Sequence, residues 1–203
     1  GKESLSKLII SDYSQTAILV DENTKKYCLP IFLENNKKFE KAKIIEIKSG
    51  EENKNISTCN YIWEQLSKYC FNRDALLINL GGGVIGDMGG YCASTYKRGI
   101  KFVQIPTTLL AMVDASIGGK LAVNLKATKN QIGLFNNPQH VLIYPYFLAT
   151  LNNTHLKSGF SEILKHTLIA NKEKWELLKM NTLEDLCMED TIYDSVNIKN
   201  NIT

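Results

Sequence analysis

The stretch of sequence that decides the fold is residues 75–86, in which the run ALLINL (75–80) is followed directly by GGGVIG (81–86). A nearly continuous apolar run is typical of a strand that is buried on both faces of a sheet. The glycine run has the spacing G-x-G-x-x-G, which lets the backbone and the N–H groups of a following helix approach a pyrophosphate. The sequence therefore predicts a strand, a tight turn and a helix.

The glycine run alone leaves its function open. Glycine-rich turns occur in many proteins that bind no nucleotide. The acidic residue that holds a ribose, expected about 20 positions later in a dinucleotide-binding domain, is also absent, because that region reads Ile105-Pro106-Thr107. A plain Rossmann dehydrogenase is therefore not the best interpretation.

On both sides of this stretch, short apolar runs alternate with helical patterns. The expected strands are residues 8–10, 17–20, 43–47 and 100–105. Apolar residues at three- and four-residue steps indicate one face of a helix: Ile56, Cys59, Trp63, Leu66 and Cys70. Alternating strands and helices predict right-handed crossovers and an α/β fold with a Rossmann-like, mostly parallel sheet.

The pattern changes after Pro145, and from about Thr154 onward the periodicity is helical. Thr154 is the expected N-cap of the first helix. The sequence therefore predicts a Rossmann-like domain over residues 1–153 and the beginning of an α-helical domain over residues 154–203.

Composition excludes several classes of protein. Of the 203 residues, 44% are hydrophobic. The chain contains 24 Lys and Arg residues and 21 Asp and Glu residues, which gives a net charge of +3. This balance suits a small anionic ligand and predicts no nucleic-acid partner. No run reaches the roughly 18 apolar residues of a membrane span, and the amino end has no apolar signal region, so a cytoplasmic protein is expected. The five cysteines have no C-x-x-C pair and predict buried, reduced thiols.

Two acidic residues follow strands in the amino half. Asp21 follows the run 17–20, and Glu51 follows the run 43–47. Open α/β sheets bind ligands at the carboxyl ends of their strands, so either side chain is a candidate for a ribose hydroxyl. A solvated carboxylate in a turn is the alternative.

A polar cluster follows the glycine run. Its members are Arg98, Thr107, Thr108, Asp114, Lys120, Asn124, Lys129 and Asn130. Lys, Arg and Asn side chains all donate hydrogen bonds to phosphate oxygens, and Asp114 is a candidate to hold or deprotonate a substrate hydroxyl. For each residue taken singly, a surface position is the alternative.

A third group lies on the expected helix over residues 161–170. Glu162 and Lys165 are three residues apart and therefore share one face of this helix. They are either a functional pair or an ion pair on the surface. Glu162 and His166 have the i, i+4 spacing of two metal ligands, although two ligands alone make a weak signal.

From Gly81 onward the chain resembles the 3-dehydroquinate synthase family. The motifs that carry the resemblance are residues 81–90 (GGGVIGDMGG), 95–99 (TYKRG), 104–111 (QIPTTLLA), 113–120 (VDASIGGK), 129–133 (KNQIG), 150–151 (TL) and 158–165 (SGFSEILK). They run in the family's order and cover most of the chain after Leu76. Upstream the resemblance is looser, through Asp21, Gly50, Glu51 and Lys54.

The resemblance implies an enzyme that uses NAD and a divalent metal, zinc or cobalt. Its substrate is a seven-carbon sugar-acid phosphate, which it converts to 3-dehydroquinate in the shikimate pathway. The residues that it implies at NAD are Asp21, Glu51, Lys54, Gly82, Gly83, Asp87, Thr107, Thr108, Lys129, Phe147, Thr150 and Leu151. Those that it implies at the substrate are Asp114, Lys120, Lys129, Asn130 and Lys165, with Arg98 reaching the phosphate from the other subunit of a homodimer. Glu162 is the implied metal ligand.

Two features depart from the family's pattern. Asn152, Thr154 and His155 stand where the family usually has Pro and then a pair such as Arg-Glu, so that Thr154 takes the place of an amide or charged side chain that contacts NAD. The family's two histidine metal ligands and its groups for the substrate carboxylate are expected beyond Thr203. The resemblance therefore implies that the 203-residue chain alone is inactive and binds NAD better than metal.

Other functions stay open at this point. They are another sugar-phosphate cyclase, such as a 2-deoxy-scyllo-inosose or valiolone-type synthase, and a catalytically silent NAD-binding fragment. Glycerol-dehydrogenase relatives share the glycine run but not Lys120 or the Lys129-Asn130 pair.

Overall fold

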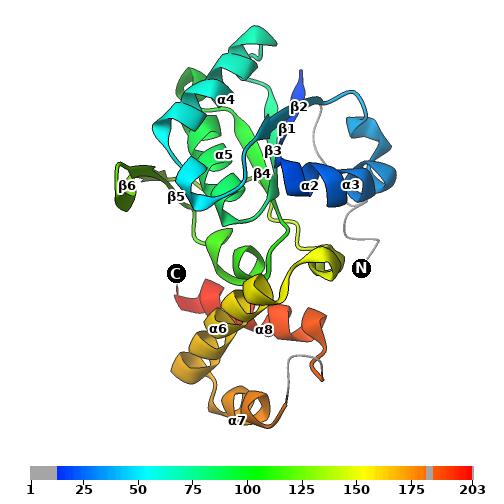
Figure 1. Ribbon diagram of the computed structural model, residues 1–203, viewed down its shortest axis with the longest axis vertical. Coiled ribbons are helices and arrows are strands. Elements are labelled where there is room, and N and C mark those ends of the chain that lie inside the picture. Colours follow the sequence, from blue (N-terminus) through cyan, green and yellow to red (C-terminus); the bar gives the residue numbers. More distant parts are fainter. Residues whose placement is uncertain (1–12, 182–184, 203) are drawn as a thin grey trace.

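The computed structural model describes residues 13–181 and 185–202 and shows a sheet with helices on both faces above a group of three helices (Figure 1). The sheet contains β1 (Thr16–Asp21), β2 (Lys43–Ile47), β3 (Leu76–Gly81) and β4 (Lys101–Pro106) in the order β2-β1-β3-β4. All three strand pairs are parallel. The predicted α/β fold with a parallel sheet is confirmed, whereas the strand expected at residues 8–10 lies outside the described residues.

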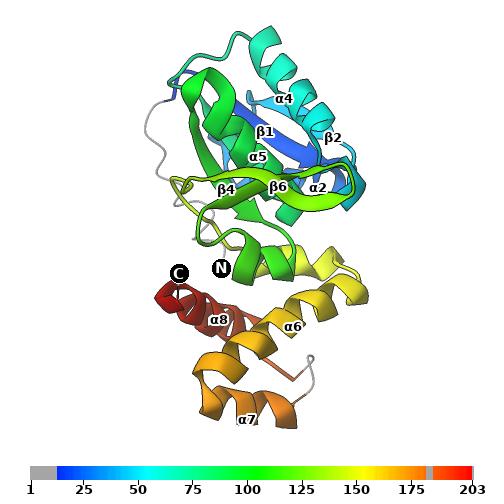
Figure 2. The ribbon, with the colours of Figure 1, turned by 90° about the vertical axis from the view of Figure 1, so that its left-hand side faces the viewer.

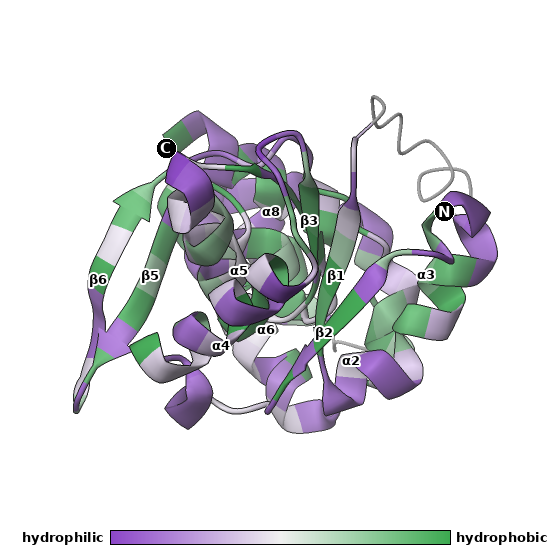
Figure 3. Cartoon of the chain, turned by 90° about the horizontal axis from the view of Figure 1, so that it is seen from above, coloured by the Kyte–Doolittle hydropathy of each residue, from purple (hydrophilic) through white to green (hydrophobic). Residues whose placement is uncertain are grey.

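Helices cover both faces of this sheet. Helices α4 (Ile56–Lys68) and α5 (Gly83–Thr95) lie on one face, and α2 (Glu22–Tyr27) and α3 (Leu29–Asn35) lie on the other (Figure 1). Short 3-10 turns complete this part: η1 (Lys37–Phe39), η2 (Glu51–Asn53) and η3 (Tyr96–Arg98). The strands are consequently the apolar centre when the molecule is viewed from above (Figure 3).

Successive residues of β1 enter two different cores. Leu19 packs in the cluster that includes residues of α4 and α5, whereas Ile18 and Val20 pack in the cluster that includes residues of α3. These three side chains have no exposed area, so the centre of β1 is fully buried on both faces of the sheet. Burial on both faces explains why the strands read as continuous apolar runs and not as alternating ones.

An antiparallel hairpin that the sequence analysis did not predict lies beside α5 (Figure 2). It is formed by β5 (Lys120–Leu125) and β6 (Thr128–Phe135) and follows a short π-helical turn, η4 (Ala111–Ala115). Leu121 and Val123 bury their side chains against the α5 layer. Gly90 makes this approach possible, because a Cβ there would lie within 2.4 Å of Leu121 Cδ2.

The carboxyl-terminal part is helical, as predicted. It begins with the turn η5 (Pro145–Thr150) and continues with α6 (Asn153–Ala170), α7 (Lys172–Met180) and α8 (Met188–Ile202). The expectation that Thr154 caps α6 is wrong by two residues. Asn152 is the N-cap, because its backbone is extended and its side chain accepts a hydrogen bond from His155 N at 2.9 Å.

These helices share a core with the sheet. Ile163 of α6, Leu178 of α7 and Ile192 of α8 belong to the cluster that also contains Ile78 of β3. Gly159 lets α6 pack closely on the segment before η4, since a Cβ there would lie 2.5 Å from Leu110 N. Because residue 159 has no side chain, the middle of α6 can lie directly against the start of η4.

The thiols only partly match the prediction. Cys28, Cys59 and Cys92 are buried, but Cys70 and Cys187 are exposed, and all five are free in the part of the chain that the structure describes. Cys70 follows the end of α4 in a left-handed conformation (φ 56°), which turns it out of the apolar face of that helix. Among residues 13–181 and 185–202, no helix combines the length and apolar character that crossing a bilayer requires.

Candidate functional site

The strand order places a switch point between β1 and β3. From β1 the chain crosses to β2 on one side and then to β3 on the other side. Because the strands are parallel, their carboxyl ends meet at one edge, where β1 ends at Asp21 and β3 ends at Gly81. Open α/β sheets bind ligands at such a point.

The glycine turn lies at this switch point. Gly82 is the N-cap of α5 and provides no side chain to cap its N–H groups. A Cβ on Gly82 would lie 3.0 Å from Thr108 Cγ2, and Thr107 N donates a hydrogen bond to Gly81 O at 3.0 Å. The turn and the two threonines therefore form one surface. Uncapped N–H groups behind bare glycine backbone fit the pyrophosphate of a dinucleotide.

Asp21 has a structural role at the same edge. Its Oδ1 accepts hydrogen bonds from Thr24 N at 2.7 Å and from Thr24 Oγ1 at 3.1 Å, which makes it the N-cap of α2. The capping explains why a carboxylate ends this strand. A contact between Asp21 and a ribose stays a prediction.

A polar network joins the turn after β2 to the hairpin. Glu51 Oε1 accepts a hydrogen bond from Asn124 Nδ2 at 2.9 Å and lies 4.0 Å from Lys129 Nζ. Asn124 Oδ1 accepts from Asn130 N at 2.9 Å, and Asn124 N donates to Lys54 O at 2.9 Å. Residues implied at NAD and residues implied at the substrate thus meet in one network.

Lys54 is the buried centre of this network. Its Nζ contacts Asp87 Oδ2 at 2.5 Å and Asn130 Oδ1 at 2.6 Å. Burial raises the pKa of Asp87, and the Lys54 ammonium opposes that increase. Lys54 thereby connects α5, through Asp87, to β6, through Asn130, two elements that are far apart in the sequence.

A cavity of about 570 Å³ opens between α5, η4, the hairpin and α8. Four of its lining residues were predicted at the cofactor or substrate: Asp87, Asp114, Lys120 and Asn130. Lys199 of α8 also lines it and forms an ion pair with Asp114 Oδ1 at 2.7 Å. The cavity therefore presents ammonium and amide donors together with carboxylates, a set that suits a hydroxylated anion.

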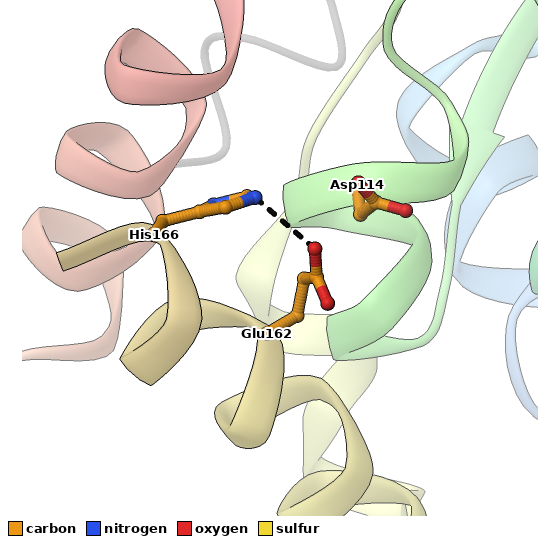
Figure 4. Close-up of side chains that lie close together, drawn as sticks. All are labelled: Asp114, Glu162 and His166. Carbon is orange, nitrogen blue, oxygen red and sulfur yellow. Dashed lines mark ion pairs between the residues drawn. The ribbon is translucent and has the colours of Figure 1, made fainter. Parts of the chain in front are cut away.

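A smaller cluster borders this cavity where α6 meets η4. Asp114, Glu162 and His166 point toward one another (Figure 4), and their ligand atoms all lie within 4.8 Å of one another. Glu162 Oε1 is 3.3 Å from His166 Nε2 and 2.5 Å from Lys165 Nζ. Burial lowers the pKa of His166, although the carboxylates of Glu162 and Asp114 oppose this, and the neutral imidazole is favoured.

Other predicted residues lie elsewhere. Phe147 is buried in the core and stacks edge-on against Tyr144, while Thr150 is exposed at the end of η5, next to the half-buried Leu151. Arg98 is exposed in η3 with a left-handed backbone (φ 68°) and is outside the lining of the described cavity.

Lys199 was missed by the sequence analysis, and His166 was weighed but not assigned. The spacing of His166 from Glu162 was a signal, whereas nothing local links Lys199 to Asp114. Their contact depends on α8 packing against η4.

The fold and this site define a doubly wound α/β unit with a glycine turn at its switch point and a polar cavity beneath appended helices. A family model described as "3-dehydroquinate synthase N-terminal" matches residues 44–158. The chain belongs to this family.

Known proteins agree with this assignment. The 3-dehydroquinate synthase of Parabacteroides distasonis is 40% identical over 193 residues, which are 94% of this chain and 54% of that protein. The chain thus spans about half the length of the curated relatives that it matches.

Two solved structures superpose with a TM-score of 0.85. One is a 2-deoxy-scyllo-inosose synthase complexed with carbaglucose-6-phosphate, NAD+ and Co2+, at 27% identity, which covers 100% of this chain and 57% of that chain. The other is a 2-epi-5-epi-valiolone synthase from Streptomyces hygroscopicus with NAD+ and Zn2+ bound, at 28% identity, which covers 96% of this chain and 57% of that chain.

Proposed function

We propose that the protein containing this chain is a 3-dehydroquinate synthase, which converts 3-deoxy-D-arabino-heptulosonate 7-phosphate to 3-dehydroquinate and phosphate. The observation that carries the proposal is the polar cavity lined by Asp114, Lys120 and Asn130, which also includes Asp87 of α5, the helix that begins at the uncapped glycine turn. Family membership and the 40% identity to a 3-dehydroquinate synthase support the same reaction.

The proposed NAD site lies at the switch point. Gly82 and Gly83 face the pyrophosphate with Thr107 and Thr108 beside them, and the α5 N-terminus stabilises its charge. The other residues proposed at NAD are Asp21, Glu51, Lys54, Asp87, Lys129, Phe147, Thr150 and Leu151. When bound, NAD would accept a hydride from a ring carbinol and later return it, and a divalent metal such as zinc or cobalt would polarise the carbinol oxygen.

The proposed substrate site is the cavity beside it. Lys120 and Asn130 donate hydrogen bonds to the substrate phosphate, and Lys129 approaches from the hairpin. Asp114 holds a substrate hydroxyl, and the Lys199 ammonium beside it suits a second anionic group.

Further groups act at the edge of this cavity. Glu162 is the proposed metal ligand, with Lys165 at the substrate. Arg98 is exposed at a turn, where it is available to the phosphate site of a second subunit in a homodimer. The role of the chain's own residues is thus to hold the reacting conformer of the substrate and its charged groups in place.

A second candidate function has an observation of its own in its favour. Both solved structures with a TM-score of 0.85 are cyclases for other sugar phosphates. Their identities of 27% and 28% are lower than the 40% to the 3-dehydroquinate synthase, so we place that reaction second. A silent NAD-binding fragment is the remaining alternative for this chain by itself.

Phosphate release by the full-length protein tests the proposal. Turnover is expected with 3-deoxy-D-arabino-heptulosonate 7-phosphate and not with glucose 6-phosphate, the oxygen-ring counterpart of the carbaglucose-6-phosphate in the first solved structure. Lys120→Ala is expected to raise KM strongly, whereas Lys101→Ala, at the opposite end of the sheet, is expected to leave it unchanged. Turnover of glucose 6-phosphate alone would establish a 2-deoxy-scyllo-inosose synthase, and no turnover of either compound would refute that reaction and the 3-dehydroquinate synthase reaction.

A further inference from the structure

Two buried amide side chains lie next to each other on the face of the sheet that α5 covers (Figure 1). Asn79 of β3 and Gln104 of β4 are partners in the parallel register of these strands, and they are 1% and 3% exposed. Leu77 and Phe102, two positions earlier on the same face, belong to an apolar cluster. A buried amide in such surroundings costs free energy unless a hydrogen bond satisfies it. Each of the two amides therefore calls for a reason.

The helix α5 meets these amides with glycines. A Cβ on Gly86 would lie 3.1 Å from Gln104 Oε1, and a Cβ on Gly89 would overlap Asn79 Oδ1. Side chains on a helix normally form ridges that fit between the side chains of the neighbouring element and so fix its position. Because residues 86 and 89 have no side chain, packing at these two positions does little to fix α5 along or about its axis.

Gln104 provides a directional contact at this place. Its Nε2 donates a hydrogen bond to Gly86 O at 2.9 Å, and Gly86 N donates to Gly82 O at 3.0 Å, which closes the first turn of α5. The strand is held on its other side as well, because Gln104 N donates to His140 O at 3.0 Å and Leu142 N donates to Gln104 O at 2.9 Å. The side chain of Gln104 thus ties the first turn of α5 to a strand that is paired on both sides.

Asn79 differs from Gln104 in this respect. Among the residues that the structure describes, neither Oδ1 nor Nδ2 of Asn79 has a hydrogen-bond partner. The two side chains end in the same amide group and are buried to a similar depth beneath the same helix. Substitutions at the two positions can therefore separate the effect of a hydrogen bond to α5 from the effect of a buried amide.

The position of the first turn of α5 decides where two parts of the proposed NAD site lie. The N–H groups at the uncapped start of the helix belong to this turn, and Asp87, which pairs with Lys54, follows Gly86 directly. We propose that Gln104 is a positioning residue, whose hydrogen bond to Gly86 O sets the rotation and axial position of α5 so that its N–H groups face the pyrophosphate of the dinucleotide. This inference rests on the NAD site of the proposed function and adds a residue that is buried behind the helix.

Calorimetric titration of NAD+ into the full-length protein tests the proposal with two matched substitutions. Gln104→Met preserves most of the side-chain volume and removes the donor. It is expected to weaken NAD+ binding about 10-fold, which is the scale of one lost hydrogen bond. Asn79→Leu removes an amide of similar burial that forms no hydrogen bond to α5, and it is expected to bind NAD+ as wild type does.

Gln104→Glu distinguishes positioning by a hydrogen bond from a merely structural role. An ionised carboxylate only accepts hydrogen bonds, whereas a protonated carboxyl group has one O–H donor. The NAD+ affinity of this variant, divided by that of wild type at the same pH, is therefore expected to rise as pH falls, because protonation restores a donor opposite Gly86 O. The same ratio for Gln104→Met is expected to stay constant, since methionine has no group that titrates.

The outcomes separate this inference from the proposed function. Equal NAD+ affinity in wild type and a folded Gln104→Met variant, or an equal loss in Asn79→Leu, would overturn the positioning role and leave the proposed NAD site standing. No NAD+ binding by wild type would refute that site and this inference together. If Gln104→Met fails to fold, Gln104→Glu decides, because a ratio to wild type that does not change with pH would overturn the proposal.

Discussion

Replacing Lys54 with Met removes the ammonium group at the centre of the polar network and preserves most of the side-chain volume. Lys54 and Asp87 have side chains that are 5% and 17% exposed, and they contact each other at 2.5 Å. Removing one partner of a buried ion pair costs about 3–5 kcal/mol, because a charge is left without compensation. Since water still reaches part of Asp87, we expect a loss near the lower limit, about 3 kcal/mol of unfolding free energy at neutral pH.

The loss should depend on pH in a defined direction. Burial already raises the pKa of Asp87, and Lys54 is the main group that lowers it. Without Lys54 the folded-state pKa rises further above the unfolded value of about 3.9. Between these two values the folded state holds a proton that the unfolded state lacks, so stability falls as pH rises through this window. The variant should therefore be nearest to wild type at acidic pH.

Urea unfolding of four proteins measures this effect: wild type, Lys54→Met, Asp87→Asn and the double variant. The double variant should recover part of the loss and lose its pH dependence, because no buried charge remains. Lys101→Met, an exposed lysine at the start of β4, is the control and should change stability by less than about 0.5 kcal/mol. A loss that is the same at every pH, or below about 1 kcal/mol, would refute the reasoning.

Other predictions concern the helical part and the thiols. Gly159→Ala should cost about 1–3 kcal/mol in urea unfolding, because its Cβ would lie 2.5 Å from Leu110 N; unchanged stability would contradict the close packing of α6. Thiol titration at neutral pH should label the exposed Cys70 and Cys187 quickly and Cys28 slowly, because burial raises the Cys28 pKa to about 12. Equal labelling rates at all three sites would be inconsistent with the burial of Cys28. Between the unfolded and folded pKa values the folded Cys28 keeps a proton that the unfolded thiol releases, so the contribution of Cys28 to stability should be lost as pH rises toward 12.

The sheet was predictable because burial on two faces leaves a strong local signal. The expected strand 43–47 is β2 as the structure has it, and the run 75–80 differs from β3 by one residue. Every residue of β3 is buried between helix layers, so its sequence is an almost uninterrupted apolar run, whereas the edge strand β2 keeps three isoleucines and buries two of them. The glycine turn after β3 was equally predictable, because the strand, the turn and the helix follow one another directly in the sequence.

The hairpin was not predictable on the same grounds. The first four residues of β6 are polar and exposed, and only Ile132 and Leu134 in its second half alternate toward a core, where they are half-buried. Only Leu121 and Val123 of β5 enter a core, which is too short an alternation to indicate a strand. A β-strand held mainly by its partner's backbone leaves little trace in its own sequence.

The candidate site was predicted in part. Family motifs indicated Asp114, Lys120, Asn130 and Glu162, and the structure brings the first three to one cavity and the fourth to its border. The contact of Lys199 with Asp114 depends on how α8 packs on η4, which no local pattern encodes. The buried state of His166 likewise follows from tertiary packing and not from its spacing along α6.

Calorimetric titration of NAD+ into wild type and Gly82→Val tests the central claim most directly, namely that the glycine turn at the switch point binds a dinucleotide. The added side chain would crowd the pyrophosphate surface, because even a Cβ at Gly82 lies 3.0 Å from Thr108 Cγ2. The account predicts one saturable NAD+ site in wild type and its loss in a folded Gly82→Val variant. No NAD+ binding by wild type, or equal affinity in the two proteins, would contradict it.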